Sequence, residues 1–488
     1  MEKILRFAFA VVMSAACADA ATISNVKIKQ LWPWSTDIRI TYCISDVGGP
    51  TDVRLECYDG GVPINCANLH NAVIGDICGI DSDGEKTITL DPVKAFGTAA
   101  GSYADFNVEL TPTDSPANGD EVIYKIFDLD ANTCENVTRN DLKNGRYGDY
   151  EKDYSRIGNG FNTTLSDVLI WTAVTNGTEY KTDKLVMRKI PAAGTVWNMG
   201  SGENELGSNY MDSPDRENRH AVRLTEDYFM SVFEVTQAQF AKFYGIKGGF
   251  TNESDSAIRP VESCDYAQTL RGMNNWLADD GSASAKEWVY WPTNAYRHCV
   301  RYNRVLGIMR KRMGVKFDLP TEAQWEFACR AGSTNALYSG KEMITVDNAL
   351  CDRNVDEIAW TVRSDYSDAP GGTNQTRAVG LKKPNAFGLY DMAGNVSEWC
   401  LDWYYADVGT FYDKSGDGMA DIEHADPLVD PVGRSAPSGT DNLRSARGSN
   451  WTLPQRYTRS AYRMGIGYTQ IKSHIGFRIV CPAADDWK

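Results

Sequence analysis

The chain has 488 residues, enough for two or three domains, and its 42% hydrophobic and 11% aromatic content indicates a globular protein. Its 65 acidic residues outnumber the 50 basic ones, which gives a net charge of −15. This excess of negative charge argues against nucleic acid and anionic membrane surfaces as general partners.

Residues 1–20 have the pattern of a secretory signal peptide. Lys3 and Arg6 precede an apolar run over 7–16, and Ala18-Asp-Ala20 matches a cleavage site. The run is too short to span a bilayer, and no later stretch is long and apolar enough. We therefore expect a secreted or periplasmic protein without a transmembrane segment, in which several of the eleven remaining cysteines are paired.

Residues 22–183 are predicted to form an all-β domain. Apolar residues alternate at Ile38, Ile40, Tyr42 and Ile44, and turns rich in Gly, Pro, Asp and Asn separate the short strands. The pattern favours an antiparallel sandwich of the immunoglobulin or fibronectin type. No titratable cluster stands out, so we expect a spacer or a binding module.

A new pattern begins at residue 185 and continues to 483, where strands and helices mix. Thr236 with Gln239, and Thr321 with Gln324, have the spacing of helix capping boxes. The first predicts a helix over 237–244 that ends at a glycine.

The stretch from 388 to 399 carries the strongest chemical signal. Asp391 and Glu398 lie seven residues apart, and Gly394 and Asn395 bend the chain between them. Such a bend can place both carboxylates, with the carbonyls of Gly394 and Val396, around one hard cation, and oxygen-only ligation suits calcium. The alternative is an aromatic-rich buried turn with ordinary surface acids.

Two motifs connect the chain to a known family. Gly388-Leu-Tyr-Asp-Met-Ala-Gly-Asn-Val-Ser-Glu-Trp399 and Leu319-Pro-Thr-Glu-Ala-Gln-Trp-Glu-Phe-Ala-Cys-Arg-Ala-Gly332 resemble the sulfatase-modifying-factor family, whose founding member is the formylglycine-generating enzyme. The resemblance covers about 185–482. It implies an α+β domain with much irregular loop, related to the C-type lectin fold. It also implies that calcium is bound by the positions of Asp391, Gly394, Val396 and Glu398.

Two further calcium sites have weaker support. The resemblance implies ligands at Asn348 and Ala349. Independently, an acidic loop has the ligand rhythm of an EF-hand at Asp413, Ser415, Asp417 and Asp421. His424 replaces the expected final glutamate, so a flexible acidic loop is the favoured interpretation there.

The residues needed for the family's chemistry are missing. Formylglycine-generating enzymes hold copper(I) with two cysteines, and thiolates are the ligands that select this metal. The resemblance places Leu453 and Thr458 at those positions, and the span 401–480 contains no cysteine. This predicts loss of the copper mechanism. The alternative is an oxidoreductase that uses the same groove with other ligands. However, none of the five histidines (His70, His220, His298, His424 and His474) has the spacing of an iron site.

The favoured hypothesis is therefore an exported, calcium-stabilised binding module for a peptide or a glycan. Aromatic and polar residues near the family's catalytic turn are the groove candidates: Asn450, Trp451, Arg456, Tyr457, Arg459 and His474. The competing interpretation makes them core and rim residues of the fold. The resemblance also implies a disulfide between Cys299 and Cys481.

Overall fold

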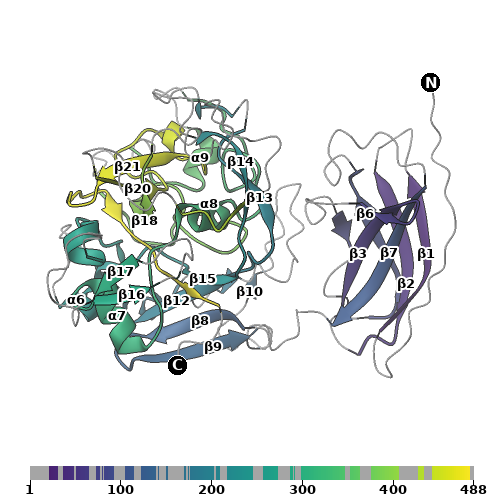
Figure 1. The fold of residues 1–488 in the computed structure, drawn as a ribbon, viewed down its shortest axis with the longest axis horizontal. Coiled ribbons are helices and arrows are strands. Elements are labelled where there is room, and N and C mark those ends of the chain that lie inside the picture. The colour runs from purple at the N-terminus through teal and green to yellow at the C-terminus, as the bar shows by residue number, and fades with distance from the viewer. Residues whose placement is uncertain are drawn as a thin grey trace. The chain divides into compact units, whose positions relative to one another are not determined.

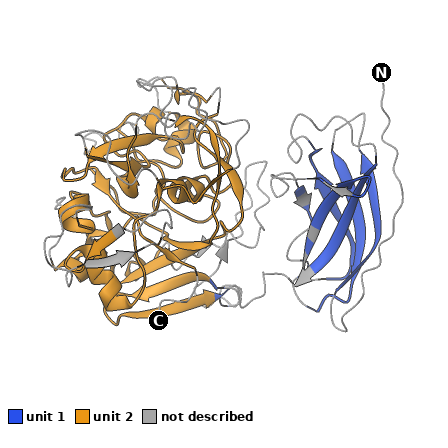
Figure 2. Cartoon of the chain, in the orientation of Figure 1, with its two compact units in different colours: residues 1–122, 138–146, 152–169 blue, residues 123–137, 147–151, 170–488 orange. Residues whose placement is uncertain are grey.

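The structure is a computed structural model of the whole chain. It describes residues 21–30, 37–48, 51–64, 73–76, 80, 82–92, 105–114, 122–138, 141, 150–151, 170–171, 174, 176–202, 205–208, 217–245, 256–272, 286–289, 291, 298–346, 352–362, 375–405, 427–432 and 442–483. The predicted signal peptide lies outside these ranges. The chain divides into two compact units, unit 1 (1–122, 138–146 and 152–169) and unit 2 (123–137, 147–151 and 170–488), shown in Figure 2.

Unit 1 consists of two antiparallel sheets. One has the strand order β1-β2-β6-β5 and the other β4-β3-β7. The strands are β1 (Thr22–Gln30), β2 (Ile38–Ser45), β3 (Thr51–Asp59), β4 (Val62–Pro63), β5 (Val73–Gly75), β6 (Gly84–Leu90) and β7 (Phe106–Asp114).

Both sheets of unit 1 contribute to one apolar core. Ile40 and Tyr42 on β2 are fully buried, and they belong to the same cluster as Leu55 of β3 and Phe106 of β7. The intervening residue Arg39 is exposed. The predicted alternation and the all-β sandwich are therefore confirmed.

Unit 2 is a mixed α/β domain with much irregular loop (Figure 1). Its largest sheet has the order β23-β15-β12-β8-β9. Its other strands form smaller sheets, among them β21-β20-β18-β22 and β13-β14-β19. The strands of unit 2 are β8 (Val122–Asp128), β9 (Thr133–Thr138), β10 (Tyr150–Glu151), β11 (Ile170–Trp171), β12 (Lys184–Ile190), β13 (Val196–Met199), β14 (His220–Arg223), β15 (Tyr228–Ser231), β16 (Lys286–Val289), β17 (His298–Arg301), β18 (Ser397–Trp403), β19 (Leu428–Val429), β20 (Leu443–Arg447), β21 (Arg463–Gly467), β22 (Ile475–Gly476) and β23 (Val480–Pro482).

The placement of β8 and β9 differs from the predicted domain boundary at 183. Both strands precede that boundary, yet β8 pairs with β12, with Phe127 opposite Leu185. Five consecutive residues of β8 are buried, as expected for a central strand covered on both faces. Strand periodicity identifies a strand but not the core that it joins, so the sequence assigned these residues to the wrong unit.

Short helices cover the sheets of unit 2. They are α5 (Glu179–Thr182), α6 (Gln237–Tyr244), α7 (Val305–Met313), α8 (Glu322–Arg330) and α9 (Arg353–Asp356), with single turns η5 (Ser256–Ile258), η6 (Tyr266–Leu270) and η9 (Gln455–Tyr457). Both predicted capping boxes are present, and α6 ends at Gly245 in the left-handed conformation, at φ 67°. No helix in the described ranges is long and apolar enough to cross a membrane.

Helix α8 lies in the middle of unit 2 (Figure 1). All nine of its residues are buried, and Trp325 and Ala328 belong to the main apolar core. The helix also buries charged side chains, since Glu326 is fully buried. Such charges need partners from other elements.

Candidate functional site

The segment that leads into β18 has the predicted bend. Asp391 and Asn395 have φ of 54° and 56°, and Gly394 has φ of 79°. A side chain at position 394 would also overlap the backbone of Trp360. Only glycine suits position 394, because the backbone has a positive φ and because Trp360 leaves no room for a side chain.

Asp391 is buried, and one of its carboxylate oxygens has no partner. Its Oδ2 accepts a hydrogen bond from the Gly380 amide at 2.7 Å. Its Oδ1 is buried without a hydrogen-bond partner among the residues that the structure describes. Burial raises the pKa of Asp391 to about 6, although the Gly380 amide and Arg478 act in the opposite direction.

Glu398 is committed to other groups. Its two oxygens accept from Arg478, with Nε–Oε2 2.6 Å and Nη2–Oε1 2.7 Å, and Oε2 also accepts from Trp325 Nε1 at 2.6 Å. All three side chains are fully buried. A carboxylate in a bidentate guanidinium pair is less available to a cation than the sequence suggested.

Glu234 is a third buried carboxyl group beside Asp391 and Glu398. The sequence did not identify it as a site residue. Its Oε2 accepts from Asn395 Nδ2 at 2.7 Å, and its Oε1 from the Val396 amide at 3.1 Å. Burial, Asp391 and Glu398 raise the pKa of Glu234 well above its usual value. The sequence signal that could have identified Glu234 is its position in the stretch Glu-Val-Thr-Gln, just before α6.

The other predicted calcium residues are less informative. The Gly394 amide donates to the Gly448 carbonyl at 2.6 Å, so the bend is also bonded to the turn after β20. Within the described ranges, no three His, Cys, Asp or Glu side chains converge in metal-binding geometry. Six candidates lie outside those ranges: Asn348, Ala349, Asp413, Ser415, Asp417 and Asp421.

Leu453 and Thr458 flank the 3-10 turn η9. Leu453 donates its amide to the Asn450 carbonyl at 3.1 Å, and its own carbonyl accepts from the Val362 amide at 3.2 Å. Thr458 is buried, and its hydroxyl donates to the Gln455 carbonyl at 2.6 Å. Hydrogen bonds therefore hold the turn in place. Leu453 has an aliphatic side chain, and the hydroxyl of Thr458 is already hydrogen-bonded.

Two of the six groove candidates are buried structural residues. Asn450 donates from Nδ2 to Ser397 Oγ at 2.9 Å and accepts from the Thr452 amide at 2.9 Å. Arg459 is 1% exposed and donates to Glu217 at 2.5 Å and 2.9 Å and to Glu205 at 3.0 Å. Both side chains are therefore buried and hydrogen-bonded within unit 2.

The other four candidates are partly exposed. Trp451 Nε1 lies 3.3 Å from the Ser473 carbonyl, and the Arg456 guanidinium lies 4.7 Å from the centre of the Tyr457 ring. His474 is half-buried, and burial together with Lys472 lowers its pKa. Two of these side chains belong to η9, and the other two come from the segments before and after it.

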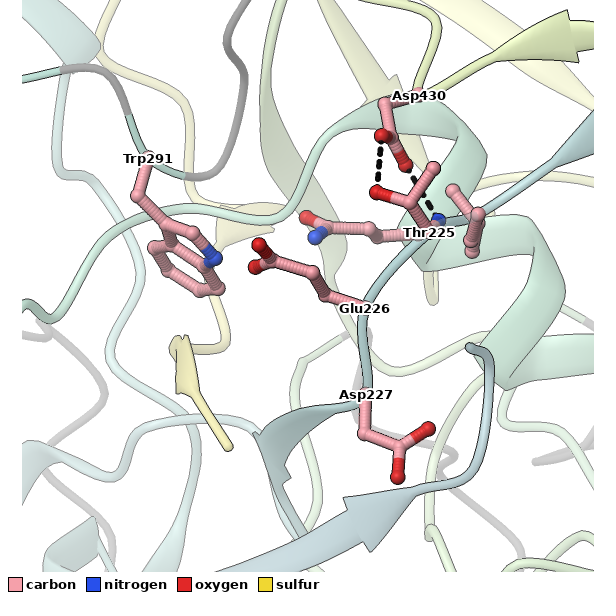
Figure 3. Close-up of a pocket in the computed structure, with 7 residues that line it drawn as sticks. Thr225, Glu226, Asp227, Trp291 and Asp430 are labelled. Carbon is pink, nitrogen blue, oxygen red and sulfur yellow. Dashed lines mark hydrogen bonds between the residues drawn. The ribbon is translucent and has the colours of Figure 1, made fainter. Parts of the chain in front are cut away.

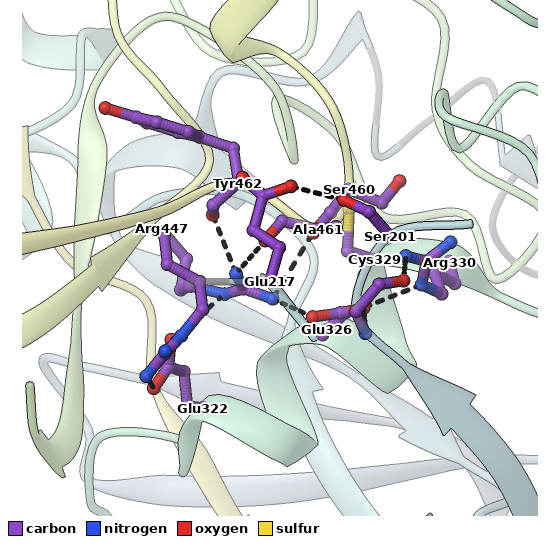
Figure 4. A network of polar contacts seen from close by, with 12 residues as sticks. Ser201, Glu217, Glu322, Glu326, Cys329, Arg330, Arg447, Ser460, Ala461 and Tyr462 are labelled. Carbon is purple, nitrogen blue, oxygen red and sulfur yellow. Dashed lines mark hydrogen bonds and ion pairs between the residues drawn. The ribbon is translucent and has the colours of Figure 1, made fainter. Parts of the chain in front are cut away.

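A buried network of arginine and glutamate side chains lies close to this turn (Figure 4). Arg447 pairs with Glu326 and donates to the Ala461 and Tyr462 carbonyls at 2.8 Å and 2.7 Å. Glu326 also accepts from Arg330 at 2.8 Å. Burial would raise the pKa of Glu326, but Arg330 and Arg447 outweigh it and hold the pKa below its usual value. Glu326 is therefore a structural anion rather than an acid–base group.

Comparison with known proteins decides the family. Residues 187–483 match the model of the sulfatase-modifying factor enzyme 1-like domain. The chain belongs to this family. The formylglycine-generating enzyme of Streptomyces coelicolor is 32% identical over 283 residues, which are 53% of this chain and 79% of that enzyme. The chaperone protein LppX of Paenibacillus barcinonensis is 27% identical over 197 residues, 36% of this chain and 63% of that protein.

Two solved structures are similar to this chain over part of its length. Treponema denticola variable protein 1 covers 61% of this chain and 95% of its own, with 23% identity and a TM-score of 0.41. The match to PvdO from Pseudomonas aeruginosa covers 61% of this chain and 94% of PvdO, with 22% identity and a TM-score of 0.39.

The disulfide that the family resemblance implies stays a prediction. The Cys299 carbonyl accepts from Arg271 Nη1 at 3.1 Å, and Arg271 pairs with Asp318 at 2.8 Å. Asp318 in turn exchanges backbone hydrogen bonds with Val480, the neighbour of Cys481. The two cysteines therefore lie on connected elements, but the structure shows no disulfide bond between them.

Proposed function

We propose that this chain is an exported binding module of the sulfatase-modifying-factor family that has lost copper-dependent formylglycine generation. The observation that carries the proposal is the turn from 453 to 458. It keeps an ordered backbone, but its two key positions hold a leucine and a threonine whose hydroxyl is already bonded. Copper(I) requires soft thiolate ligands, and these two side chains do not fit it.

The nearby thiol does not replace the missing ligands. Cys329 is fully buried, and burial raises the pKa of its thiol to about 12. A thiol with so high a pKa does not supply the thiolate that a metal needs at neutral pH. Cys329 therefore does not complete a copper site with Leu453 and Thr458.

The partly exposed side chains beside the turn support a binding role. Trp451 and Tyr457 offer flat apolar faces, and Arg456 offers a planar cation with several donors. The buried side chains of Asn450 and Arg459 hold in place the turn that carries these three residues. Such a surface suits an extended peptide or a glycan, because both combine apolar faces with hydrogen-bonding groups.

Calcium fits the acidic cluster behind the bend, with a ligand set different from the one expected. The unpartnered Oδ1 of Asp391 is the kind of buried polar atom that an ion satisfies. Glu234 is the second buried carboxyl group behind the bend, and a cation there would offset the burial and the negative neighbours that raise its pKa. Glu398 would stay with Arg478. When bound, calcium would supply charge neutralisation and cross-linking of the bend, not redox chemistry.

The calcium proposal is tested on the mature chain by elemental analysis and by thermal unfolding with and without chelator. We expect calcium alone, and stabilisation of unit 2 by about 2.7 kcal/mol at a concentration of 100 times Kd. Asp391→Asn should abolish this stabilisation, whereas Asp46→Asn in unit 1 should retain it. Stoichiometric iron or copper would instead support the oxidoreductase alternative.

The binding proposal is tested with glycan and peptide arrays. Trp451→Ala and Arg456→Ala should each lose the captured ligands, and Lys341→Ala, an exposed change on another segment, should keep them. In parallel, the chain is incubated with a cysteine-containing peptide, copper(I) and oxygen, and aldehyde is sought with a hydrazine reagent. Aldehyde formation that exceeds the protein-free control would contradict the loss of catalysis.

A further inference from the structure

A small pocket lies on unit 2, within the span that matches the family model. Its lining comes from the segment between β14 and β15, from the start of α8, from the end of β19 and from one tryptophan (Figure 3). The lining residues are Leu224, Thr225, Glu226, Asp227, Trp291, Gln324 and Asp430.

Glu226 and Trp291 form opposite walls of this pocket. Figure 3 shows the Glu226 carboxylate extending toward the indole of Trp291. Glu226 is exposed and has no hydrogen-bond or ion-pair partner in the part of the chain that the structure describes. Trp291 is half-buried and packs against the main core of unit 2, so its ring is held in place. A carboxylate that faces an anchored indole is the pairing that attracts an organic cation.

The other two carboxylates of the pocket, Asp227 and Asp430, differ in whether a cation neutralises them. Asp227 points away from Trp291 in Figure 3, pairs with Lys189 at 3.2 Å and accepts from the Ala193 amide at 2.9 Å. Asp430 accepts from the amide and the hydroxyl of Thr225, at 2.8 Å and 2.5 Å. These hydrogen bonds fix Asp430 without neutralising it, so the pocket keeps an excess of negative charge.

Gln324 supplies an independent polar group. It is only 7% exposed, and its Oε1 accepts from the Thr321 amide at 3.0 Å as part of the capping box. Its Nε2 donates to no residue in the described ranges, so this amide group is the polar end left for the pocket. Nε2 is not among the buried polar atoms that lack a partner, so it reaches solvent in the pocket and can donate to an acceptor that enters there.

The size of the pocket limits that ligand. The free volume in which the centre of a water-sized group can move is about 20 Å³. A volume of roughly 10–15 Å³ on this measure holds one water molecule. One small group therefore enters, and an ammonium group offers three donors to surrounding acceptors.

We propose that this pocket binds a primary ammonium group of a peptide, with the cation at the Glu226 carboxylate beside the indole of Trp291 and with Asp430 adding negative charge to the lining. Gln324 Nε2 then donates to a neighbouring carbonyl oxygen. Both the amino terminus of a peptide and a lysine side chain carry this group. The site is separate from the surface around Trp451, so it does not depend on the proposed function.

The test uses the mature chain labelled with 5-fluorotryptophan, with the Trp291 signal assigned through Trp291→Phe. Glycinamide and n-butylammonium are titrated, and N-acetylglycinamide and n-butanol are their uncharged counterparts. We expect a saturable shift of the Trp291 signal with both cations and none with the uncharged compounds. Glu226→Gln should weaken binding about threefold to fivefold, as for an exposed ion pair. Glu342→Gln, an exposed change elsewhere, should have no effect.

Two peptides then distinguish the sources of the ammonium group. One has a free amino terminus and no lysine, and the other is acetylated at its amino terminus and contains one lysine. Binding of either supports the proposal and identifies its source. The proposal is overturned if neither cation shifts the Trp291 signal, if the uncharged compounds bind equally well, or if Glu226→Gln binds as tightly as the native chain. It is also overturned if a neutral sugar such as methyl glucoside binds in preference to both cations.

Discussion

The cores of the two units are built from different side chains. In the described part of unit 1, the buried side chains are apolar apart from Thr51. Unit 2 fully buries Arg271, Arg447 and Arg478, each paired with a carboxylate. Aliphatic packing stabilises by removing area from water, whereas a buried ion pair contributes little net stability and is costly to break. The two units should therefore respond differently to mutation and to pH.

The largest difference is expected from Arg478→Ala. This change leaves Glu398 buried without its guanidinium partner and should destabilise unit 2 by about 3–5 kcal/mol. Urea unfolding followed by tryptophan fluorescence and circular dichroism measures it, and we expect one transition for each unit. Replacing both partners, Arg478→Met with Glu398→Leu, should recover part of the loss. A double variant as unstable as the sum of its single variants would show that the pair is not coupled.

The matching change in unit 1 is Ile40→Ala. Ile40 is fully buried in the sandwich core, and truncating it should cost about 2–5 kcal/mol through lost burial and the cavity left behind. Only the unit 1 transition should move. Arg39→Ala, at the adjacent exposed position, is the control and should leave both transitions unchanged. A shift of the unit 2 transition would mean that the units unfold together.

Below about pH 4, acid should destabilise unit 2 before unit 1. The raised pKa values of Asp391 and Glu234 act in the opposite direction, because their protonation favours the folded state, but this gain is complete once the pH is below their ordinary values of 3.8 and 4.5. Burial alone would raise the pKa of Glu322, but Arg463 and Arg447 outweigh it and hold the pKa at about 2, below the ordinary value of 4.5. A depressed pKa contributes stability that is present above pH 4.5 and is lost as the pH falls toward 2. For this one group the loss is about 3 kcal/mol. Urea midpoints measured from pH 6 to pH 3 test this order, and Glu322→Gln should flatten the dependence for unit 2.

The smallest effects separate the two kinds of groove candidate. Asn450→Ala removes the acceptor of the Thr452 amide and one of the two hydrogen bonds of Ser397 Oγ, which keeps its bond to the Ser449 carbonyl, and should cost about 1–3 kcal/mol. Trp451→Ala, at a partly exposed position, should change stability by less than about 1 kcal/mol. Differential scanning calorimetry of the two variants provides the measurement. Equal melting temperatures would contradict the structural role given to Asn450.

Local sequence rules identified the features that depend on a few neighbouring residues. Thr321 and Gln324 are three positions apart, so their capping box could be recognised before the fold was known. The alternation around Ile40 and the bend at Gly394 are equally local, because side-chain direction and backbone conformation are set within a few residues. The family motifs, which are contiguous, were identified for the same reason.

Tertiary structure decided which partners each side chain meets. Glu398 pairs with Arg478, 80 residues away, and Glu234 reaches Asn395 across 161 residues. No local rule predicts such pairs, because any of the buried arginines could satisfy the same carboxylate. The assignment of β8 to unit 2 and the pocket between Glu226 and Trp291 have the same origin. Periodicity and composition determine what an element is, and packing between distant segments determines what it contacts.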